Sequence, residues 1–221
     1  MSGQLRLMCI YSAQSVGAVV GLVASLIVLG WFFDIGALKA IIPGQSAVPA
    51  NSSLTWALAG WSLLLISTTN RWTLLLGRLL SVAVIFTGLI TLFTTVFNVD
   101  QGFDWLAFQT RDDSIPIQFP GEMVIQESIP FILIGASLLL VGLKKKALRI
   151  VCAVLAIAAA LPSLQALVGY GFSNPELFTY CTGNECARLH LVLALLCVIF
   201  CFALLFCARP GGKFLSSAQQ I

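Results

Sequence analysis

The chain has 221 residues, of which 59% are hydrophobic and only 10% are charged, with a net charge of +3. Soluble domains carry about a quarter charged residues and just under half apolar ones, so this composition excludes a water-exposed globule and indicates an integral membrane protein. Apolar runs recur along the whole length, which excludes a soluble domain behind a signal peptide. The length permits about six membrane spans with their loops, and it leaves no room for a kinase, cyclase or nucleotide-binding domain of about 100 residues.

Six apolar stretches follow one another along the chain, and each predicts a membrane-spanning helix because the ~10-residue alternation of barrel strands is missing. They are Ser15–Phe33, Ser52–Thr68, Leu79–Phe97, Ile129–Leu143, Ile150–Val168 and Leu189–Ala208. The second and fourth are short, and the polar runs 51–53 and 126–128 extend them as helix-capping first turns. The sequence therefore predicts an all-α, six-helix bundle over residues 15–208, with a cytoplasmic N-terminus (1–14) and a cytoplasmic tail (209–221).

Charge predicts the orientation of these spans, since basic residues in short loops are retained on the cytoplasmic side. Nine basic residues and no acidic one fall on one side: Arg6, Arg71, Arg78, Lys144, Lys145, Lys146, Arg149, Arg209 and Lys213. All nine acids fall on the other side: Asp34, Asp100, Asp104, Asp112, Asp113, Glu122, Glu127, Glu176 and Glu185. The three remaining basic residues, Lys39, Arg111 and Arg188, fall there together with them. We expect both termini in the cytoplasm, with three loops facing the periplasm or the exterior. A nucleic-acid role is excluded because the run 144–146 lies between two spans without aromatic stacking partners.

A weak internal repeat divides the bundle into three helical hairpins, at about 15–72, 73–146 and 147–208. In each unit the first helix ends in an aromatic and small-residue turn, and the second begins with a polar residue. The three second helices begin Asn51-Ser52-Ser53-Leu54, Gln126-Glu127-Ser128-Ile129 and His190-Leu191-Val192-Leu193. Ser52, Glu127 and Leu191 are thus equivalent positions.

The run Leu29-Gly30-Trp31-Phe32-Phe33, then Pro43-Gly44 and Asn51-Ser52-Ser53-Leu54-Thr55-Trp56-Ala57-Leu58-Ala59-Gly60, resembles the N-terminal multi-pass sensor modules of bacterial histidine kinases and diguanylate cyclases. The ending Arg209-Pro210-Gly211-Gly212 before Leu215-Ser216-Ser217 is similar to their exit from the last helix. The resemblance implies a membrane-embedded sensor that relays a stimulus to a C-terminal output domain. The chain ends at residue 221, so either that domain is missing here or the module works as a separate subunit.

Small residues at helical spacing form a stripe on the first helix, which allows the backbone of another helix to approach closely. The stripe consists of Ala13, Gly17, Gly21 and Ser25. It serves either packing within the chain or contact with a second copy in a homodimer.

Cys181 and Cys186 fall in an outer loop, with a turn-like spacer between them. An oxidising compartment favours a disulfide between them. A metal site is not expected, because two thiols and the single histidine of the chain cannot complete four ligands.

The second helix of each unit begins with one polar residue, and we expect these three residues at the same membrane depth: Asn51, Gln126 and His190. They act either as helix caps or as ligand-binding groups in an outer-half cavity flanked by Trp31, Trp56 and Tyr170, which would orient a small amphipathic ligand.

No Ser-His-Asp set, paired intramembrane carboxylates or phosphate-binding glycine loop occurs, so no enzymatic activity is expected. The leading hypothesis is a signal-input module that senses a stimulus from the outer side or the membrane and passes it to a cytoplasmic output domain or partner. The alternative is a non-catalytic accessory or structural subunit of a larger membrane complex. A transporter is disfavoured, because the chain lacks broken charged helices and an inverted pair of halves. The sequence names no cofactor.

Overall fold

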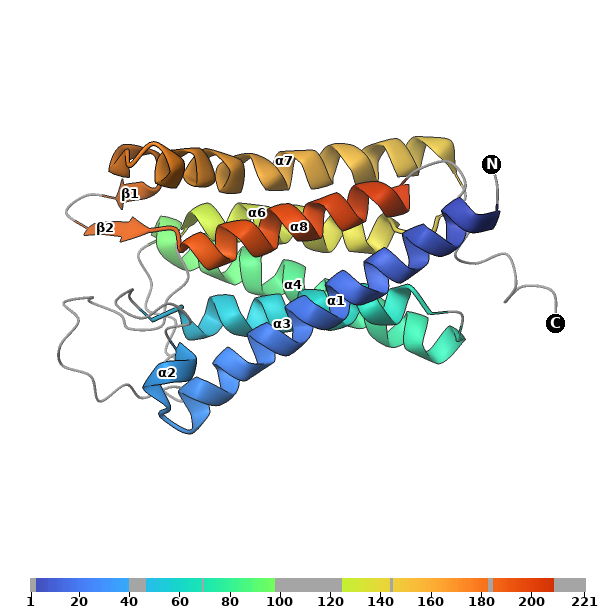
Figure 1. The fold of residues 1–221 in the computed structure, drawn as a ribbon, viewed down its shortest axis with the longest axis horizontal. Coiled ribbons are helices and arrows are strands. Elements are labelled where there is room, and N and C mark those ends of the chain that lie inside the picture. The colour runs from blue at the N-terminus through green and yellow to red at the C-terminus, as the bar shows by residue number, and fades with distance from the viewer. Residues whose placement is uncertain are drawn as a thin grey trace.

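The computed structural model describes residues 3–39, 47–68, 70–97, 125–143, 145–182 and 185–208 (Figure 1). Side chains are described there except at residues 3–7, 125–126, 180–182 and 185–188. The expected cytoplasmic tail (209–221) and the segment 98–124 lie outside the described residues. In chain order the elements are α1 (Gly3–Phe32), α2 (Gly36–Lys39), α3 (Ala50–Ile66), α4 (Arg71–Phe97), α6 (Ile125–Leu140), α7 (Lys146–Gly171), a 3-10 turn η1 (Pro175–Leu177), strands β1 (Thr179–Thr182) and β2 (Glu185–Arg188), and α8 (Leu191–Ala208).

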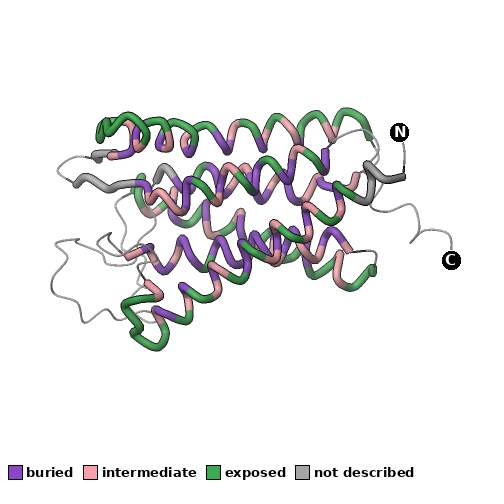
Figure 2. Tube along the Cα trace, in the orientation of Figure 1, coloured by how far each residue is buried: buried purple, intermediate pink, exposed green. Residues whose placement is uncertain are grey.

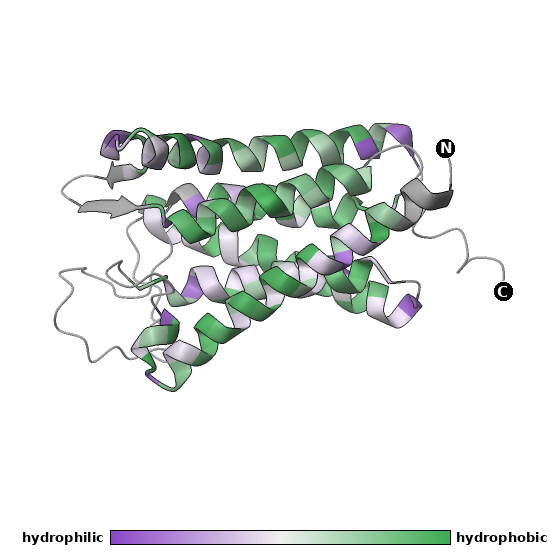
Figure 3. Cartoon of the chain, viewed as in Figure 1, coloured by the Kyte–Doolittle hydropathy of each residue, from purple (hydrophilic) through white to green (hydrophobic). Residues whose placement is uncertain are grey.

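The protein is helical, and its long helices are those of a membrane protein. Among the described residues, four helices are long and apolar enough to cross a membrane: α1 over Met8–Phe32, α4, α7 and α8. These helices expose large apolar side chains along their length, including Leu22, Phe86, Ile157 and Phe202. Figures 2 and 3 show the same pattern, with apolar residues on exposed faces and hydrophilic ones gathered toward the helix ends. Such faces suit lipid and are rare on soluble proteins.

Each long helix packs on the next one along the chain, and α1 also packs on α8, so the helices close around a shared interior. The closest neighbours are α1 with α3, α4 with α6, and α7 with α8. Helix α3 buries 11 of its 17 residues, which explains why it tolerates three serines, a threonine and a glycine. A helix with little lipid-facing surface needs few large apolar side chains, and small polar ones allow close contact with its neighbours.

The small-residue stripe on α1 packs on α3 of the same chain. A Cβ added at Gly17 would lie 2.8 Å from the backbone nitrogen of Leu64, and one added at Gly60 would lie 2.3 Å from that of Gly21. Ser25 extends this contact because its Oγ accepts a hydrogen bond from Nε1 of Trp61, at 3.1 Å. Ala13, in the same stripe, is fully buried. The stripe therefore serves packing within the chain, and its contact face is not available to a second copy.

Serines join two further helix pairs, α3–α4 and α6–α7, through buried hydrogen bonds. Ser62 of α3 donates to the carbonyl of Gly77 on α4 at 2.8 Å, and Ser137 of α6 donates to the carbonyl of Cys152 on α7 at 3.1 Å. A hydroxyl that bonds a neighbouring backbone carbonyl satisfies itself inside the bundle and fixes the contact between the two helices.

The helix starts differ from those expected from hydropathy. Helix α1 begins at Gly3, α4 at Arg71 and α7 at Lys146, each before its apolar run, because a helix continues through charged residues that hydropathy counts as loop. Residues 3–14, expected to precede the bundle, belong to α1. The capping prediction for α3 is wrong, because Pro49 is its N-cap and no side chain caps it. Helix α6 begins at Ile125, so Glu127 lies inside its first turn.

The two ends of the molecule differ in the elements they carry. The β1–β2 hairpin, α2 and the starts of α3, α6 and α8 lie at one end, called here the hairpin end (Figure 1). The starts of α1, α4 and α7 lie at the other, called the opposite end. The hairpin was not foreseen from the sequence, which indicated only a turn between its cysteines.

Candidate functional site

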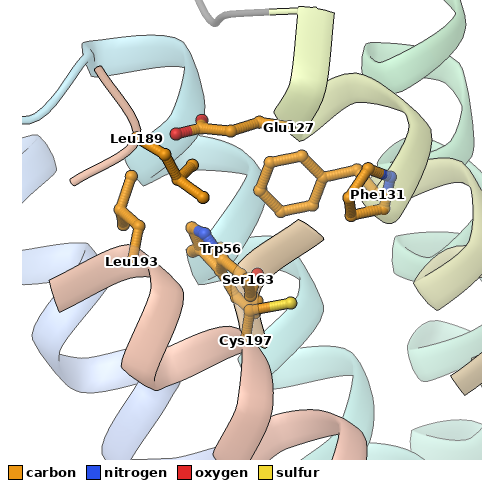
Figure 4. Close-up of a pocket in the computed structure, with 8 residues that line it drawn as sticks. Trp56, Glu127, Phe131, Ser163, Leu189, Leu193 and Cys197 are labelled. Atoms are coloured by element: carbon orange, nitrogen blue, oxygen red, sulfur yellow. The ribbon is translucent and has the colours of Figure 1, made fainter. Parts of the chain in front are cut away.

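A small cavity lies near the hairpin end, where α3, α6, α7 and the start of α8 meet (Figure 4). Its volume is about 10 Å³, enough for about one water molecule. Its lining residues are Trp56, Glu127, Pro130, Phe131, Ser163, Leu189, Leu193 and Cys197. The wall is therefore mostly apolar, and a few polar groups converge on it.

Glu127 is the acidic group of this cavity, and it is 5% exposed. It occupies the first turn of α6, where the free backbone N–H groups of a helix favour negative charge. The hydroxyl of Ser52, on α3, donates a hydrogen bond to Oε2 of Glu127. The other carboxylate oxygen, Oε1, is buried and has no hydrogen-bond partner. A buried carboxylate oxygen without a donor is costly, so this atom is a functional candidate.

Trp56 supplies the second unpartnered polar atom of the cavity. Its side chain is 3% exposed, and its indole Nε1 is buried without a hydrogen-bond acceptor. The ring is held edge-on by Phe131 of α6, with centroids 5.0 Å apart, and by Phe200 of α8, at 5.7 Å. These contacts fix the direction of the N–H, because an indole packed between two rings has little freedom to turn.

The rest of the cavity wall comes from α7 and α8. Ser163 is 4% exposed, and Cys197 is buried with its thiol directed to the carbonyl of Ala159 at 3.6 Å. Leu189 and Leu193 close the wall beside them (Figure 4). The site therefore joins one N–H donor and one carboxylate oxygen in apolar surroundings. Within the described ranges no group of three or more His, Cys, Asp or Glu side chains could hold a metal ion.

Of the expected ligand-binding residues whose side chains the structure describes, only Trp56 lines this cavity. Trp31 donates through Nε1 to the carbonyl of Val48 at 2.8 Å, at the join of α1 and α3. Tyr170 donates to the carbonyl of Leu189 at 2.8 Å and stacks on Phe178, in a separate apolar cluster under the hairpin. Tyr170 therefore belongs to a different apolar cluster from Trp56, whereas Trp31 packs against the same core cluster as Trp56 without lining the cavity.

Asn51 and His190, the two described side chains among the polar residues expected at the helix starts, do not line the cavity either. Both are partly buried; of their chain neighbours, Leu189 lines the cavity and Ser52 bonds to Glu127. The side chain of Gln126 lies outside the described residues. Their convergence on one ligand stays a prediction; among the described side chains, Glu127 and Trp56 line the cavity, and Ser52 bonds to Glu127.

Sequence reasoning placed Glu127 among the outer acids and did not single out Ser52 for a site. One signal pointed to them, because the repeat makes Ser52 and Glu127 equivalent positions of two units. The structure joins these equivalent positions by a hydrogen bond.

The outer cysteines lie opposite each other in the hairpin. Strands β1 and β2 are antiparallel, and their register pairs the Cα of Cys181 with that of Cys186. The side chains of both residues lie outside the described ones, so the disulfide stays a prediction. Direct pairing across two strands brings Cα atoms to about 4.5–5.5 Å, which is within the range that a disulfide spans.

No protein-family model, curated protein or solved structure matches the chain.

Proposed function

We propose that the chain is a signal-input module in the inner membrane of a bacterium, crossing it six times with both termini in the cytoplasm. The observation that carries the proposal is the cavity between α3, α6, α7 and α8, where Glu127 Oε1 and Trp56 Nε1 are both buried without partners. Inside membrane proteins, costly polar groups of this kind mark ligand or ion sites.

The charge distribution supports the orientation. Of the described basic residues, Arg71, Lys145 and Lys146 lie at the starts of α4 and α7, at the opposite end, whereas Lys39 ends α2 at the hairpin end and pairs with Asp34. The acids Asp34 and Glu176 lie beyond the hairpin-end termini of α1 and α7. With basic residues in the cytoplasm, the cavity faces the outer half of the bilayer. Helices α3 and α6 then complete six crossings, because they pack along their neighbours between the two ends.

A relay follows from the helices that line the cavity. Helix α8 contributes Leu193 and Cys197 to the wall and runs on to the opposite end. Packed helices respond to a change at a binding site by shifts of about 1–2 Å, which carry the change from one end of the bundle to the other. Occupation of the cavity would move α8 against α4, which contributes no residue to the cavity wall, and present the shift to an output domain or partner.

The relay is tested by filling the cavity with Cys197→Met. Spin labels at positions 72 and 206, on exposed residues of α4 and α8 at the opposite end, report the distance between these helices in lipid nanodiscs. The five described cysteines are buried and free, so labels are introduced after replacing only positions 181 and 186 by serine. We expect Cys197→Met to shift the distance by about 1–2 Å.

Cys201→Met is the matched control, because it adds the same volume one turn further along α8, outside the cavity wall. An equal shift in both variants would assign the effect to overpacking in general. No shift in either variant, together with stoichiometric purification with one partner, would instead favour an accessory subunit of a membrane complex.

A further inference from the structure

The unpartnered atoms of the cavity restrict the chemistry of what binds there. Trp56 Nε1 can only donate a hydrogen bond, whereas Glu127 Oε1, as a carboxylate oxygen, accepts one. The other carboxylate oxygen is already occupied by Ser52. A group that satisfies both atoms must therefore accept from the indole and donate to the carboxylate.

A hydroxyl group meets this requirement with a single oxygen, since it carries one donor and two acceptor positions. With Glu127 ionised, a carbonyl offers no donor to Glu127, an ammonium group offers no acceptor to Trp56, and a second carboxylate would be repelled by the first. The cavity volume of about 10 Å³ is close to the least that holds one water-sized oxygen.

We infer that this cavity is a hydroxyl-binding site, in which one oxygen accepts from Trp56 Nε1 and donates to Glu127 Oε1. The hydroxyl comes either from a bound water molecule or from a small alcohol whose apolar chain leaves the cavity along Leu189 and Leu193. The inference rests on the proposed function because it names the ligand that the signal-input module would sense. The binding of a hydroxyl group does not itself depend on the relay.

The surrounding contacts make the site selective. The rings of Phe131 and Phe200 hold the indole in place, and Ser52 orients the carboxylate, so neither polar atom can turn away to find another partner. A ligand lacking either hydrogen-bonding function leaves one buried atom unsatisfied. Such a loss weakens binding by about tenfold or more.

The test uses the full chain in nanodiscs with tryptophan labelled by nitrogen-15, and reads the indole N–H resonance of Trp56, assigned with Trp56→Phe. In titrations, n-butanol should shift this resonance along a saturable curve, and butanone should bind at least about tenfold more weakly. Glu127→Gln should bring the two compounds to within about threefold, because an amide can present either a donor or an acceptor. If that variant does not fold, the comparison of butanol and butanone in the unaltered protein still tests the hydroxyl site.

Trp61→Phe is the matched control, since it removes an indole on the same helix whose Nε1 is bonded to Ser25 away from the cavity. It should leave the preference for butanol unchanged. A cross-peak between the Trp56 indole proton and water that butanol displaces identifies the alcohol as ligand, and one that butanol leaves unchanged identifies water. Absence of both the cross-peak and the butanol shift, or equal binding of butanone, would overturn the hydroxyl site.

The outcomes separate the two proposals. Selective hydroxyl binding without a helix shift in Cys197→Met would refute the relay and leave the site standing. A helix shift in Cys197→Met, in a protein whose cavity neither water nor butanol enters, would refute the hydroxyl site and leave the relay standing.

Discussion

At the scale of single residues, Glu127 is held inside the bundle by two features of its position. It lies in the first turn of α6, where the helix dipole favours a negative charge. Its Oε2 also accepts a hydrogen bond from the hydroxyl of Ser52 on α3. A hydrogen bond to a charged group contributes more than one between neutral groups. Ser52 is therefore a structural partner of Glu127 and joins two helices that are separated in the chain.

Removal of that partner should destabilise the protein. We expect Ser52→Ala to lower the free energy of unfolding by about 1–3 kcal/mol, because it leaves the whole carboxylate without a side-chain donor. In a Glu127→Leu background the same substitution should cost much less, since no carboxylate then remains to be satisfied. Equilibrium unfolding in mixed detergent micelles measures both values. Ser53→Ala is the control, because Ser53 donates only to the carbonyl of Pro49 next to its own helix; an equal loss there would contradict the role of Ser52.

Asp34 offers a pH-dependent test outside the membrane-spanning segments. A hydrogen bond from Lys39, together with its positive charge, lowers the pKa of Asp34 below its ordinary value of 3.8. The contact is therefore complete at neutral pH and is lost as the pH falls through this lowered pKa. Carboxyl-carbon NMR should find the pKa of Asp34 below 3.8 in the native protein and closer to it in Lys39→Met. An unchanged titration in the variant would show that the ion pair does not form.

At the scale of elements, close contact between backbones explains where the helices cross. Gly17 and Gly60 bring α1 and α3 together so closely that no Cβ fits, and a Cβ at Gly21 would crowd the Trp61 ring at 3.2 Å. Gly36 in α2 has nothing within 4 Å of an added Cβ. The sequence indicated the stripe on α1 but not its partner, because the matching glycine on α3 stands among serines and leucines without a repeat of its own.

Gly60→Ala should therefore destabilise the pair α1–α3. The added methyl would lie 2.3 Å from the backbone nitrogen of Gly21, so one helix must move, at a cost of about 1–3 kcal/mol. Gly36→Ala should change the unfolding free energy by less than about 0.5 kcal/mol. Thermal unfolding of the two variants in the same detergent gives the comparison, and equal midpoints would argue against the crossing.

The hairpin β1–β2 carries a prediction of its own. Because its register pairs Cys181 with Cys186, we expect a disulfide in protein kept from reductants. Non-reducing mass spectrometry should find the peptide that contains both residues lighter by two hydrogens, while the buried Cys152 stays a free thiol. Alkylation of both hairpin cysteines without prior reduction would disprove the bond.

At the scale of the whole molecule, hydropathy located the helices well and their ends poorly. The apolar run from Ile150 lies inside α7, but the helix begins at Lys146, since charged residues continue a helix into the membrane surface without any hydropathy signal. The site was harder to predict. The repeat indicated that Ser52 and Glu127 are equivalent, but the cavity also needs Ser163 and Cys197, whose place depends on how α7 and α8 pack.

The orientation of the whole bundle rests on the separation of basic and acidic residues, and it decides which side of the membrane can reach the cavity. Single cysteines at positions 113, 180 and 146 of a cysteine-free chain test it in intact cells. A membrane-impermeant maleimide should label positions 113 and 180 from outside, but position 146 only after the membrane is permeabilised. Position 180 lies in β1, at the end of the molecule where Glu127 and Trp56 meet, whereas position 146 begins α7 at the opposite end. Labelling from outside at 146 and not at 180 would place the cavity in the cytoplasmic half, so that an input could reach Glu127 only from within the cell.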